Sequence, residues 1–254
     1  MMQEISVDNV ALKVKRVTLA KERPTLVFLH DSLGCIRLWR DFPEALGHAT
    51  HCNVLVYDRQ GYGESPPFAP GDRQPDYLEK EADVLHHLLE QAGIASAILF
   101  GHSDGGSIAL IAAAKYPAAI KAVITEGAHI FVEQLTLDGI RNAAADYRTT
   151  DLGERLQKYH GEKTDALFSA WAKTWFTEAF RHWNIEHFLP AITCPVLVIQ
   201  GESDEFGTLR QVEGIVSQVG GKAEKLVVPG TGHTPHKDAR AIVLQKATEF
   251  IRSL

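Results

Sequence analysis

The sequence has few of the features that mark several classes of protein. It contains only three cysteines, Cys35, Cys52 and Cys194, which are far apart and odd in number. They form no C-x-x-C spacing, so we expect neither a disulfide framework nor a thiol-rich metal site, and a reduced, cytoplasmic setting is favoured. No apolar run reaches about 18 residues, the length that a membrane-spanning helix needs. Residues 1–9 lack the basic and apolar regions of a signal peptide.

The chain also lacks an excess of basic charge. Its 26 basic and 32 acidic residues give a net charge of −6, and no basic stripe is visible, which argues against a nucleic-acid partner. The 45% hydrophobic and 23% charged residues are typical of an ordinary soluble globular protein. We therefore expect no nucleic-acid or membrane partner. We also expect a monomer or homodimer that acts on a small molecule.

Short apolar runs rich in β-branched residues alternate with helical patterns along most of the chain. Nearly unbroken apolar runs are typical of strands buried on both faces of a parallel sheet. The expected strands are residues 25–29, 53–57, 97–100, 122–125, 196–200 and 225–228, and the expected helices are residues 77–91, 107–116, 208–219 and 239–251. Residues 4–19 alternate in polarity and predict an antiparallel hairpin at the sheet edge. The chain therefore predicts an α/β fold with a mostly parallel central sheet and helices on both faces.

One long segment interrupts this alternation. Residues 130–190 contain no convincing strand and include three of the four tryptophans. We expect them to form a helical lid, or cap, inserted into an α/β core made of residues 1–129 and 191–254.

Aromatic residues follow a helical period inside this insertion. Leu167, Trp171, Trp175 and Ala179 recur every four residues, as on one stripe of a helix. The stripe either packs the insertion onto the core or provides an apolar wall for a substrate. Trp171 and Trp175 are the candidate substrate-binding residues under the second interpretation.

The most specific local motif is Gly101-His-Ser-Asp-Gly105, which lies directly between an expected strand and an expected helix. This is G-x-S-x-G in the strand–turn–helix context that places a nucleophilic serine on a sharp turn. The two glycines leave room for the strand and the helix to pack closely. The N–H groups at the start of the helix point toward the place where negative charge develops. Ser103 is therefore the candidate nucleophile.

A serine hydroxyl needs a base to remove its proton and a carboxylate to orient that base. Asp204 and His233 each follow one of the last two expected strands. The order Ser103, Asp204, His233 is the order expected for this architecture, and open α/β sheets place their sites at these strand ends. The sequence predicts that the three form a catalytic triad.

Both partners of the serine have neighbours of the same chemical type. Glu202 and Glu205 compete with Asp204 for the role of the orienting acid. His236 competes with His233, but it is expected to begin the final helix, whereas His233 follows a flexible Gly-Thr-Gly.

A tight turn at Leu29-His-Asp-Ser-Leu-Gly34 ends the first core strand and is a candidate oxyanion hole. Two N–H donors are needed to hold the developing oxyanion. We expect one from Asp104, directly after the nucleophile, and the other from Ser32 or Leu33.

These stretches together resemble the α/β-hydrolase superfamily over nearly the whole chain. The matching stretches are residues 30–34, 58–65, 101–106, 201–204 and 230–233, in the usual order and at normal intervals. Residues 103–117 and Gly127-Ala-His-Ile-Phe-Val132 are similar to the valacyclovir hydrolase (biphenyl-hydrolase-like) branch. The resemblance implies a serine hydrolase fold and mechanism, and enzymes of that branch hydrolyse α-amino-acid esters.

Two residues near the nucleophile need separate interpretation. In that branch the aspartate after the nucleophile contacts the ammonium group of the substrate, a role that the resemblance gives to Asp104. The alternative is that Asp104 only stabilises the N-terminus of its helix. Asp31 stands where many relatives have glycine, and a carboxylate there would oppose an oxyanion unless it points away or is paired.

The turn at residues 58–65 is interpreted as structural. Gly61 and Gly63 are expected to make it tight, and Arg59 is expected to pair with a carboxylate. No metal-ligand spacing joins the histidines to acidic residues, and no phosphate-binding glycine motif follows a strand. We therefore expect neither a metal nor a cofactor.

The sequence favours a hydrolase that cleaves a carboxylic ester or a related small acyl substrate through covalent catalysis. A carbon–carbon bond hydrolase of a ring-cleavage product would use the same triad, with arginines of the insertion holding its anionic ends. The candidates are Arg141, Arg148, Arg155 and Arg181. A ligand receptor without turnover is a third possibility. Dehalogenase and epoxide hydrolase chemistry is disfavoured, because those relatives have aspartate at the position of Ser103.

Overall fold

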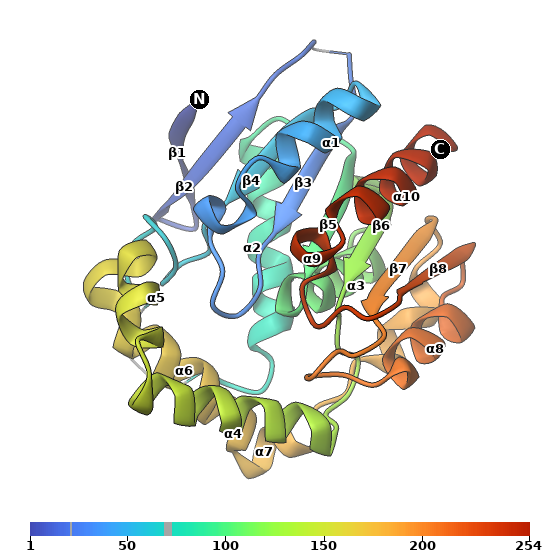
Figure 1. The fold of residues 1–254 in the computed structure, drawn as a ribbon. Helices are drawn as coiled ribbons and strands as arrows, with labels where there is room; N and C mark the ends of the chain where they lie inside the picture. The colour runs from blue at the N-terminus through green and yellow to red at the C-terminus, as the bar shows by residue number, and fades with distance from the viewer. Residues whose placement is uncertain (21, 69–72) are drawn as a thin grey trace.

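An eight-stranded sheet runs through the computed structural model, which describes residues 1–20, 22–68 and 73–254 (Figure 1). The strands are β1 (Met2–Val7), β2 (Val10–Val17), β3 (Thr25–Leu29), β4 (Asn53–Tyr57), β5 (Ala97–His102), β6 (Ile120–Glu126), β7 (Val196–Gly201) and β8 (Ala223–Val228). Their order across the sheet is β1-β2-β4-β3-β5-β6-β7-β8. β2 is antiparallel to both β1 and β4, and the later neighbours are parallel. The predicted sheet and its edge hairpin are confirmed.

The hairpin turns at Asp8 and Asn9, whose φ angles are 49° and 66°. Two successive positive φ angles make the type of tight turn whose twist matches that of antiparallel strands, and aspartate and asparagine tolerate this conformation.

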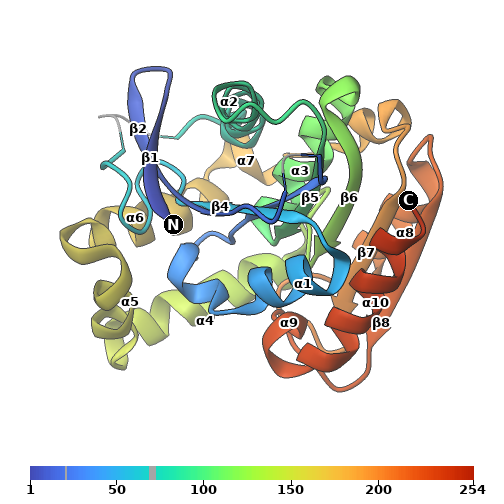
Figure 2. The same cartoon turned by 90° about the horizontal axis from the view of Figure 1, so that it is seen from above.

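Helices cover both faces of the sheet (Figure 2). They are α1 (Phe42–Thr50), α2 (Tyr77–Gln91), α3 (Asp104–Lys115), α4 (Gln134–Thr149), α5 (Leu152–His160), α6 (Thr164–Phe176), α7 (Glu178–Arg181), α8 (Leu209–Gln218), α9 (Pro235–Asp238) and α10 (Arg240–Arg252). α2, α3 and α8 contribute Leu85, Ile108 and Ile215 to the core on one face. α1 and α10 contribute Leu46 and Ala247 to the core on the other face. The predicted α/β layering is therefore confirmed.

Three local expectations about helices differ from the structure. The sequence did not predict α1, because Gly47 weakens its helical pattern. Burial of Phe42 and Leu46 stabilises this helix in the structure. α3 begins at Asp104, three residues earlier than expected. The final helix begins at Arg240, and the separate short helix α9 contains His236, so His236 does not begin the final helix.

The aromatic stripe predicted in the insertion is also shorter than expected. Leu167, Trp171 and Trp175 lie on α6, but Ala179 lies on α7. Thr177 separates the two helices with an extended backbone, and its hydroxyl accepts a hydrogen bond from the Phe180 N–H. A threonine in this position caps the next helix in preference to continuing the previous one.

The strand order creates a switch point between β3 and β5. From β3 the chain passes to β4 on one side, whereas from β5 it passes to β6 on the other side. The loops that follow these two adjacent strands therefore diverge at the carboxyl ends of the strands, which is where open α/β sheets bind their ligands. The loops in question contain residues 30–34 and Ser103.

The segment between β6 and β7 is helical and lies beyond the carboxyl ends of the parallel strands (Figure 1). It contains α4 to α7 and two short 3-10 helices, Gly161–Lys163 and Glu186–Ala191. Its two ends meet at an isolated bridge between Phe131 and Asn184. This segment is called the cap below; its role as a lid stays a prediction.

Two cap residues hold the cap against loops of the core. The Nδ1 of His160 accepts a hydrogen bond from the Gly63 N–H at 2.9 Å, and its Nε2–H donates to the Leu33 carbonyl at 3.0 Å. Lys163 donates from Nζ to the carbonyls of Gly63, at 2.7 Å, and Ser65. The turn at residues 58–65 is therefore a part of the core to which the cap is hydrogen-bonded.

Arg59 in this turn is fully buried, but its contacts differ from the expectation. Its Nη2 donates to the carbonyls of His30 and Asp31, at 3.3 and 2.9 Å. Within the described part of the chain it forms no ion pair with a carboxylate, so that prediction is wrong. The guanidinium instead satisfies carbonyls of the turn after β3 and fixes its position.

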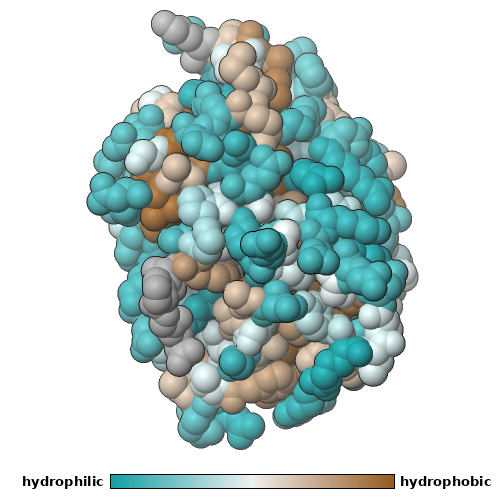
Figure 3. All heavy atoms as spheres, turned by 90° about the vertical axis from the view of Figure 1, so that its left-hand side faces the viewer, coloured by the Kyte–Doolittle hydropathy of each residue, from teal (hydrophilic) through white to brown (hydrophobic). Residues whose placement is uncertain are grey.

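The face drawn in Figure 3 is mostly hydrophilic, with hydrophobic residues in separate areas between the polar ones. Such a mixture is ordinary for a protein surface in contact with water. Among the described helices, none is long and apolar enough to cross a membrane.

The His160 contact predicts a pH dependence of stability. Burial lowers the pKa of His160 in the folded protein. Below the pKa of histidine in the unfolded chain, about 6.5, the unfolded chain therefore binds a proton at this residue more readily than the folded chain does. Stability from this residue is present above that pH and is lost as the pH falls. The substitution His160→Gln keeps an acceptor and a donor but does not titrate.

Urea unfolding of both proteins between about pH 7.5 and pH 5 measures this difference. The wild type is expected to lose stability relative to His160→Gln over that interval, because only the wild-type residue titrates. Parallel pH profiles for the two proteins would contradict the assignment.

Candidate active site

Ser103 occupies a strained turn between β5 and α3. Its backbone has φ 54° and ψ −120°, a conformation that residues with a side chain rarely adopt. The glycines on either side explain how the turn fits. A Cβ at Gly101 would lie 2.2 Å from the Gly105 carbonyl oxygen, and a Cβ at Gly105 would lie 2.2 Å from the Leu29 carbonyl oxygen. The turn therefore requires both glycines and presses Ser103 toward the loop after β3.

The side chains of Ser103, His233 and Asp204 form a continuous chain of hydrogen bonds. The Ser103 hydroxyl donates to Nε2 of His233 at 2.9 Å. The Nδ1–H of His233 faces both carboxylate oxygens of Asp204 at 2.9 Å each. Loops after β5, β7 and β8 carry these residues, and the parallel strands bring the loops to one edge of the sheet. The structure thus brings together the three residues that the sequence predicts.

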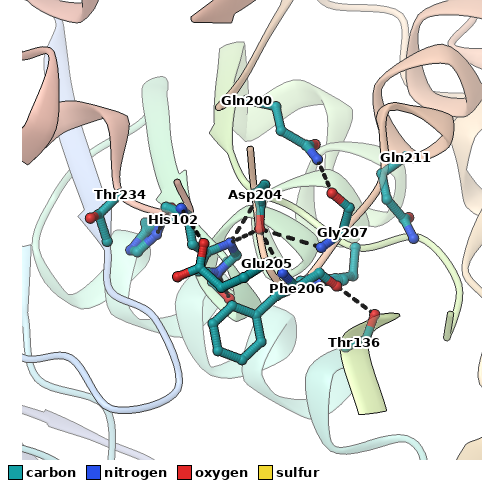
Figure 4. A network of polar contacts seen from close by, with 12 residues as sticks. His102, Thr136, Gln200, Asp204, Glu205, Phe206, Gly207, Gln211 and Thr234 are labelled. Carbon is teal, nitrogen blue, oxygen red and sulfur yellow. Dashed lines mark hydrogen bonds and ion pairs between the residues drawn. The ribbon is translucent and has the colours of Figure 1, made fainter. Parts of the chain in front are cut away.

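Backbone and side-chain contacts fix the loop of Asp204 (Figure 4). Its Oδ1 accepts hydrogen bonds from the N–H groups of Phe206 and Gly207, at 2.8 and 3.3 Å. The Gln200 side-chain amide donates to the Gly207 carbonyl, and the Thr136 hydroxyl of the cap donates to the Phe206 carbonyl, both at 2.6 Å. The carboxylate therefore has a defined orientation.

Electrostatics keep Asp204 ionised. Burial alone would raise the pKa of this carboxyl, but the charge and hydrogen bond of His233 and the Phe206 N–H hold it below its usual range. An ionised carboxylate at Nδ1 fixes the tautomer of His233 and stabilises its protonated form.

The competing acids contact other groups. Glu202 accepts a hydrogen bond from the Gly230 N–H at 3.2 Å, and Glu205 accepts one from the backbone N–H of His233 at 3.1 Å. Glu205 therefore supports the loop of His233, whereas the carboxylate that faces the His233 ring is that of Asp204.

The competing histidine has a carboxylate of its own. The Nδ1–H of His236 donates to Oε1 of Glu126 at 2.6 Å, and its ring packs 4.7 Å from the ring of Trp39. Both His236 and Glu126 are buried. These contacts separate His236 from the Ser103 hydroxyl, which is bonded to His233.

The candidate oxyanion donors lie on two elements that pack closely. Asp104 is the first residue of α3, so its N–H has no carbonyl one helical turn earlier to bond. Ser32 is buried in a turn that the Gly34 N–H closes onto the Asp31 carbonyl at 3.2 Å. Contact between Gly105 and the Leu29 carbonyl places this turn beside the nucleophile. That Ser32 and Asp104 hold an oxyanion stays a prediction.

Trp171 and Trp175 reach the candidate site through intermediate rings. Trp175 packs edge-on at 5.5 Å against His129, which lies 5.9 Å from the His233 ring. Trp171 lies 6.5 Å from Phe206, which lies 4.8 Å from His233. Both tryptophans are buried, so they pack the cap onto the site; their contact with a substrate stays a prediction.

The Asp104 carboxylate lies on a buried polar contact. It is 1% exposed, and its Oδ2 accepts a hydrogen bond from the Tyr77 hydroxyl at 3.0 Å. Tyr77 comes from α2, so this contact ties two helices of one face together.

The arginines of the cap do not converge on the site. Their side chains are exposed, and the two with an ion pair find it three or four residues earlier in the sequence, Arg141 with Asp138 and Arg155 with Asp151. Arg148 and Arg181 are also exposed. This arrangement offers no anion clamp in the described structure.

Sequence reasoning missed three residues that surround the His233 ring. Phe206 and His129 pack against it, and Gly127 sits under it with φ 58°. The available signal was weak: Gly127 and His129 lie two and four residues after an expected strand, and Phe206 lies two residues after Asp204. Their roles depend on loops that meet only in the folded chain.

Comparison with known proteins agrees with this architecture. Residues 26–245 match the model of the alpha/beta hydrolase family. The chain belongs to this family. Human serine hydrolase BPHL is 34% identical over 161 residues, 59% of this chain and 53% of the human protein. The match thus spans about half the length of that relative, and it agrees with the resemblance to the biphenyl-hydrolase-like branch.

Solved structures of the same fold cover nearly the whole chain. MGS-M2, an alpha/beta hydrolase enzyme from a Medee basin deep-sea metagenome library, has a TM-score of 0.81 at 20% identity and covers 98% of this chain and 96% of its own. A meta-cleavage product hydrolase from Pseudomonas fluorescens has a TM-score of 0.77 at 15% identity, covering 99% and 97%. At these identities the likeness establishes the fold.

Gly127 provides a test of the site geometry. A Cβ there would lie 2.8 Å from Cε1 of His233 and 3.4 Å from Oδ2 of Asp204. We expect Gly127→Ala to displace the imidazole and to lower kcat by about 100-fold, as displacements of about 1 Å can do. The measurement is steady-state hydrolysis of p-nitrophenyl acetate.

Gly93→Ala is the matched control. Gly93 has φ 67°, similar to Gly127, but a Cβ there meets nothing within 4 Å. Both substitutions are expected to cost about 1 kcal/mol of stability for the left-handed backbone, and only Gly127→Ala should slow turnover. Equal kcat values for the two variants would contradict the proposed packing.

Proposed function

We propose that this protein is a serine hydrolase that cleaves a carboxylic ester or a related small acyl substrate by covalent catalysis. The observation that carries the proposal is the unbroken contact from Ser103 through His233 to Asp204, with each step at 2.9 Å. A hydroxyl, an imidazole and a carboxylate in this order can move one proton away from oxygen as that oxygen attacks a carbonyl carbon.

The first half of the reaction forms an acyl-enzyme. His233 takes the proton of Ser103 while Oγ bonds to the carbonyl carbon, and the carbonyl oxygen becomes an oxyanion. The N–H groups of Asp104 and Ser32 hold that oxyanion. When the tetrahedral intermediate collapses, the bond to the leaving alkoxide breaks, and His233 gives it the proton.

The second half releases the acid. A water molecule gives a proton to His233 and attacks the acyl carbon, which forms a second oxyanion. Collapse of this intermediate returns the proton to Ser103 and frees the carboxylic acid. Asp204 stays ionised throughout and stabilises the imidazolium at each stage.

The carbon–carbon bond hydrolase has less support than the esterase. It needs cationic groups for two anionic ends of a substrate, and the four cap arginines considered for this task are exposed. The family match is compatible with both reactions.

The decisive test uses the nucleophile. Wild-type protein is expected to hydrolyse p-nitrophenyl acetate and to be labelled by a fluorophosphonate probe, and Ser103→Ala is expected to lose both properties while it remains folded. Ser217→Ala, on the exposed face of α8, is the matched control and should retain both. Full activity in Ser103→Ala would refute the mechanism, and an unlabelled wild type would favour a ligand receptor without turnover.

We further propose that Asp104 gives preference to acyl groups that carry an α-ammonium group. Its buried carboxylate directly follows the nucleophile and can attract a substrate cation as well as accept the Tyr77 hydrogen bond.

L-alanine ethyl ester and ethyl propionate differ only in that ammonium group. Asp104→Asn should lower kcat/KM for the alanine ester by about tenfold or more relative to the propionate. An equal loss on both substrates would show that Asp104 serves only its helix.

A further inference from the structure

Asp31 places a negative charge directly before Ser32, the candidate oxyanion donor. Among the described residues, Asp31 is not one of those with a positive φ. The backbone at this position therefore does not require glycine. Its side chain is 31% exposed. A carboxylate next to an oxyanion hole would oppose catalysis unless another charge compensates it. The structure supplies a partner.

That partner is His102, the last residue of β5 and the neighbour of the nucleophile. Its side chain is buried, and its Nε2 lies 2.8 Å from the carbonyl oxygen of His233. Its Nδ1 lies 3.7 Å from Oδ1 of Asp31. A carbonyl oxygen only accepts hydrogen bonds, so Nε2 carries a hydrogen, and Nδ1 faces a carboxylate. The 3.7 Å separation is that of an ion pair, and a carboxylate at this distance from Nδ1 favours the ring that is protonated on both nitrogens and positively charged.

The charges around this pair support the same protonation state. Burial opposes a charge on His102, but Asp31 and, less strongly, Glu126 raise its pKa, while Lys237 acts in the opposite direction. Burial also opposes ionisation of Asp31, and His102 and Lys237 hold the pKa of that carboxyl well below its usual range. Other titratable groups near the pair are His30, which also lowers the pKa of Asp31, and His233 and His236, whose ring centroids lie 5.1 and 5.2 Å from that of His102.

We propose that His102 is a positioning residue that stays protonated, neutralises Asp31 beside the oxyanion turn, and holds the loop of His233 through its carbonyl. The inference rests on the proposed function, because an oxyanion forms only if Ser103 attacks a carbonyl. It links three loops, those after β3, β5 and β8, through one buried imidazolium. No part of the triad mechanism requires this residue to exchange a proton with the substrate.

A charge-compensation cycle tests the proposal with four proteins: wild type, His102→Gln, Asp31→Asn and the double variant. In His102→Gln the amide can still donate to the His233 carbonyl, but Asp31 loses the largest of its compensating charges and keeps only the weaker effect of Lys237 and His30. We expect kcat on p-nitrophenyl acetate to fall about tenfold with little change in KM, because the stray charge opposes only the transition state. Asp31→Asn in the same protein should restore most of kcat.

The outcome separates charge from structure. If His102 only packs or donates one hydrogen bond, the double variant stays as slow as His102→Gln or becomes slower, and the proposal is overturned. An unchanged kcat in His102→Gln would overturn it as well. The control is Asp8→Asn with His87→Gln, a surface aspartate–histidine pair at 2.9 Å, which should leave kcat unchanged.

A second measurement needs no active variant. In ¹⁵N NMR spectra of the wild type at about pH 7.5, where an ordinary histidine is neutral, His102 should show two protonated ring nitrogens. A neutral ring would overturn the proposal even if His102→Gln failed to fold. Fluorophosphonate labelling of the wild type distinguishes failure of the proposed function from failure of the inference about His102. If the wild type is not labelled, the proposed function fails, and the inference fails with it. With labelling and no rescue, the inference alone fails.

Discussion

The left-handed backbone of Ser103 is the constraint on which the candidate site depends. A φ of 54° turns the chain so sharply that β5 passes directly into α3, and it is possible only because Gly101 and Gly105 allow backbones to touch. The same close approach brings α3 against the end of β3. One strained residue therefore sets the position of the hydroxyl, the helix N-terminus and the turn that contains Ser32.

Three histidine–carboxylate pairs lie side by side around this turn. His233 faces Asp204, His102 faces Asp31, and His236 faces Glu126. Only the first pair contacts the Ser103 hydroxyl, and this contact distinguishes the candidate base from its neighbours. In a buried site each added charge needs a partner, because unpaired charges lose their hydration without compensation. The pairing explains how several acidic residues can lie close together around the candidate site.

The cap is joined to the same turns by polar contacts. His160 bonds the Leu33 carbonyl of the candidate oxyanion turn, and Thr136 bonds the carbonyl of Phe206 next to Asp204. Movement of the cap would therefore affect both the turn after β3 and the loop that carries Asp204. Arg59 acts from the core side, where it holds the carbonyls of His30 and Asp31. The turn after β3 is thus fixed from the core, from the cap and from the end of β5.

The sequence by itself determined the parallel sheet, the edge hairpin and the motif around Ser103, because these depend on short-range patterns of polarity, glycine and turn residues. It also indicated Asp204 and His233, since each lies in a loop that follows an expected strand. It did not reveal Gly127, the partner of Asp31 or the contacts of Arg59, and it extended the aromatic stripe past Thr177. These depend on which loops the strand order β4-β3-β5-β6 brings together, and no local pattern encodes that order. Tertiary structure therefore decided the neighbours of each charge, because electrostatic partners are selected by distance in space.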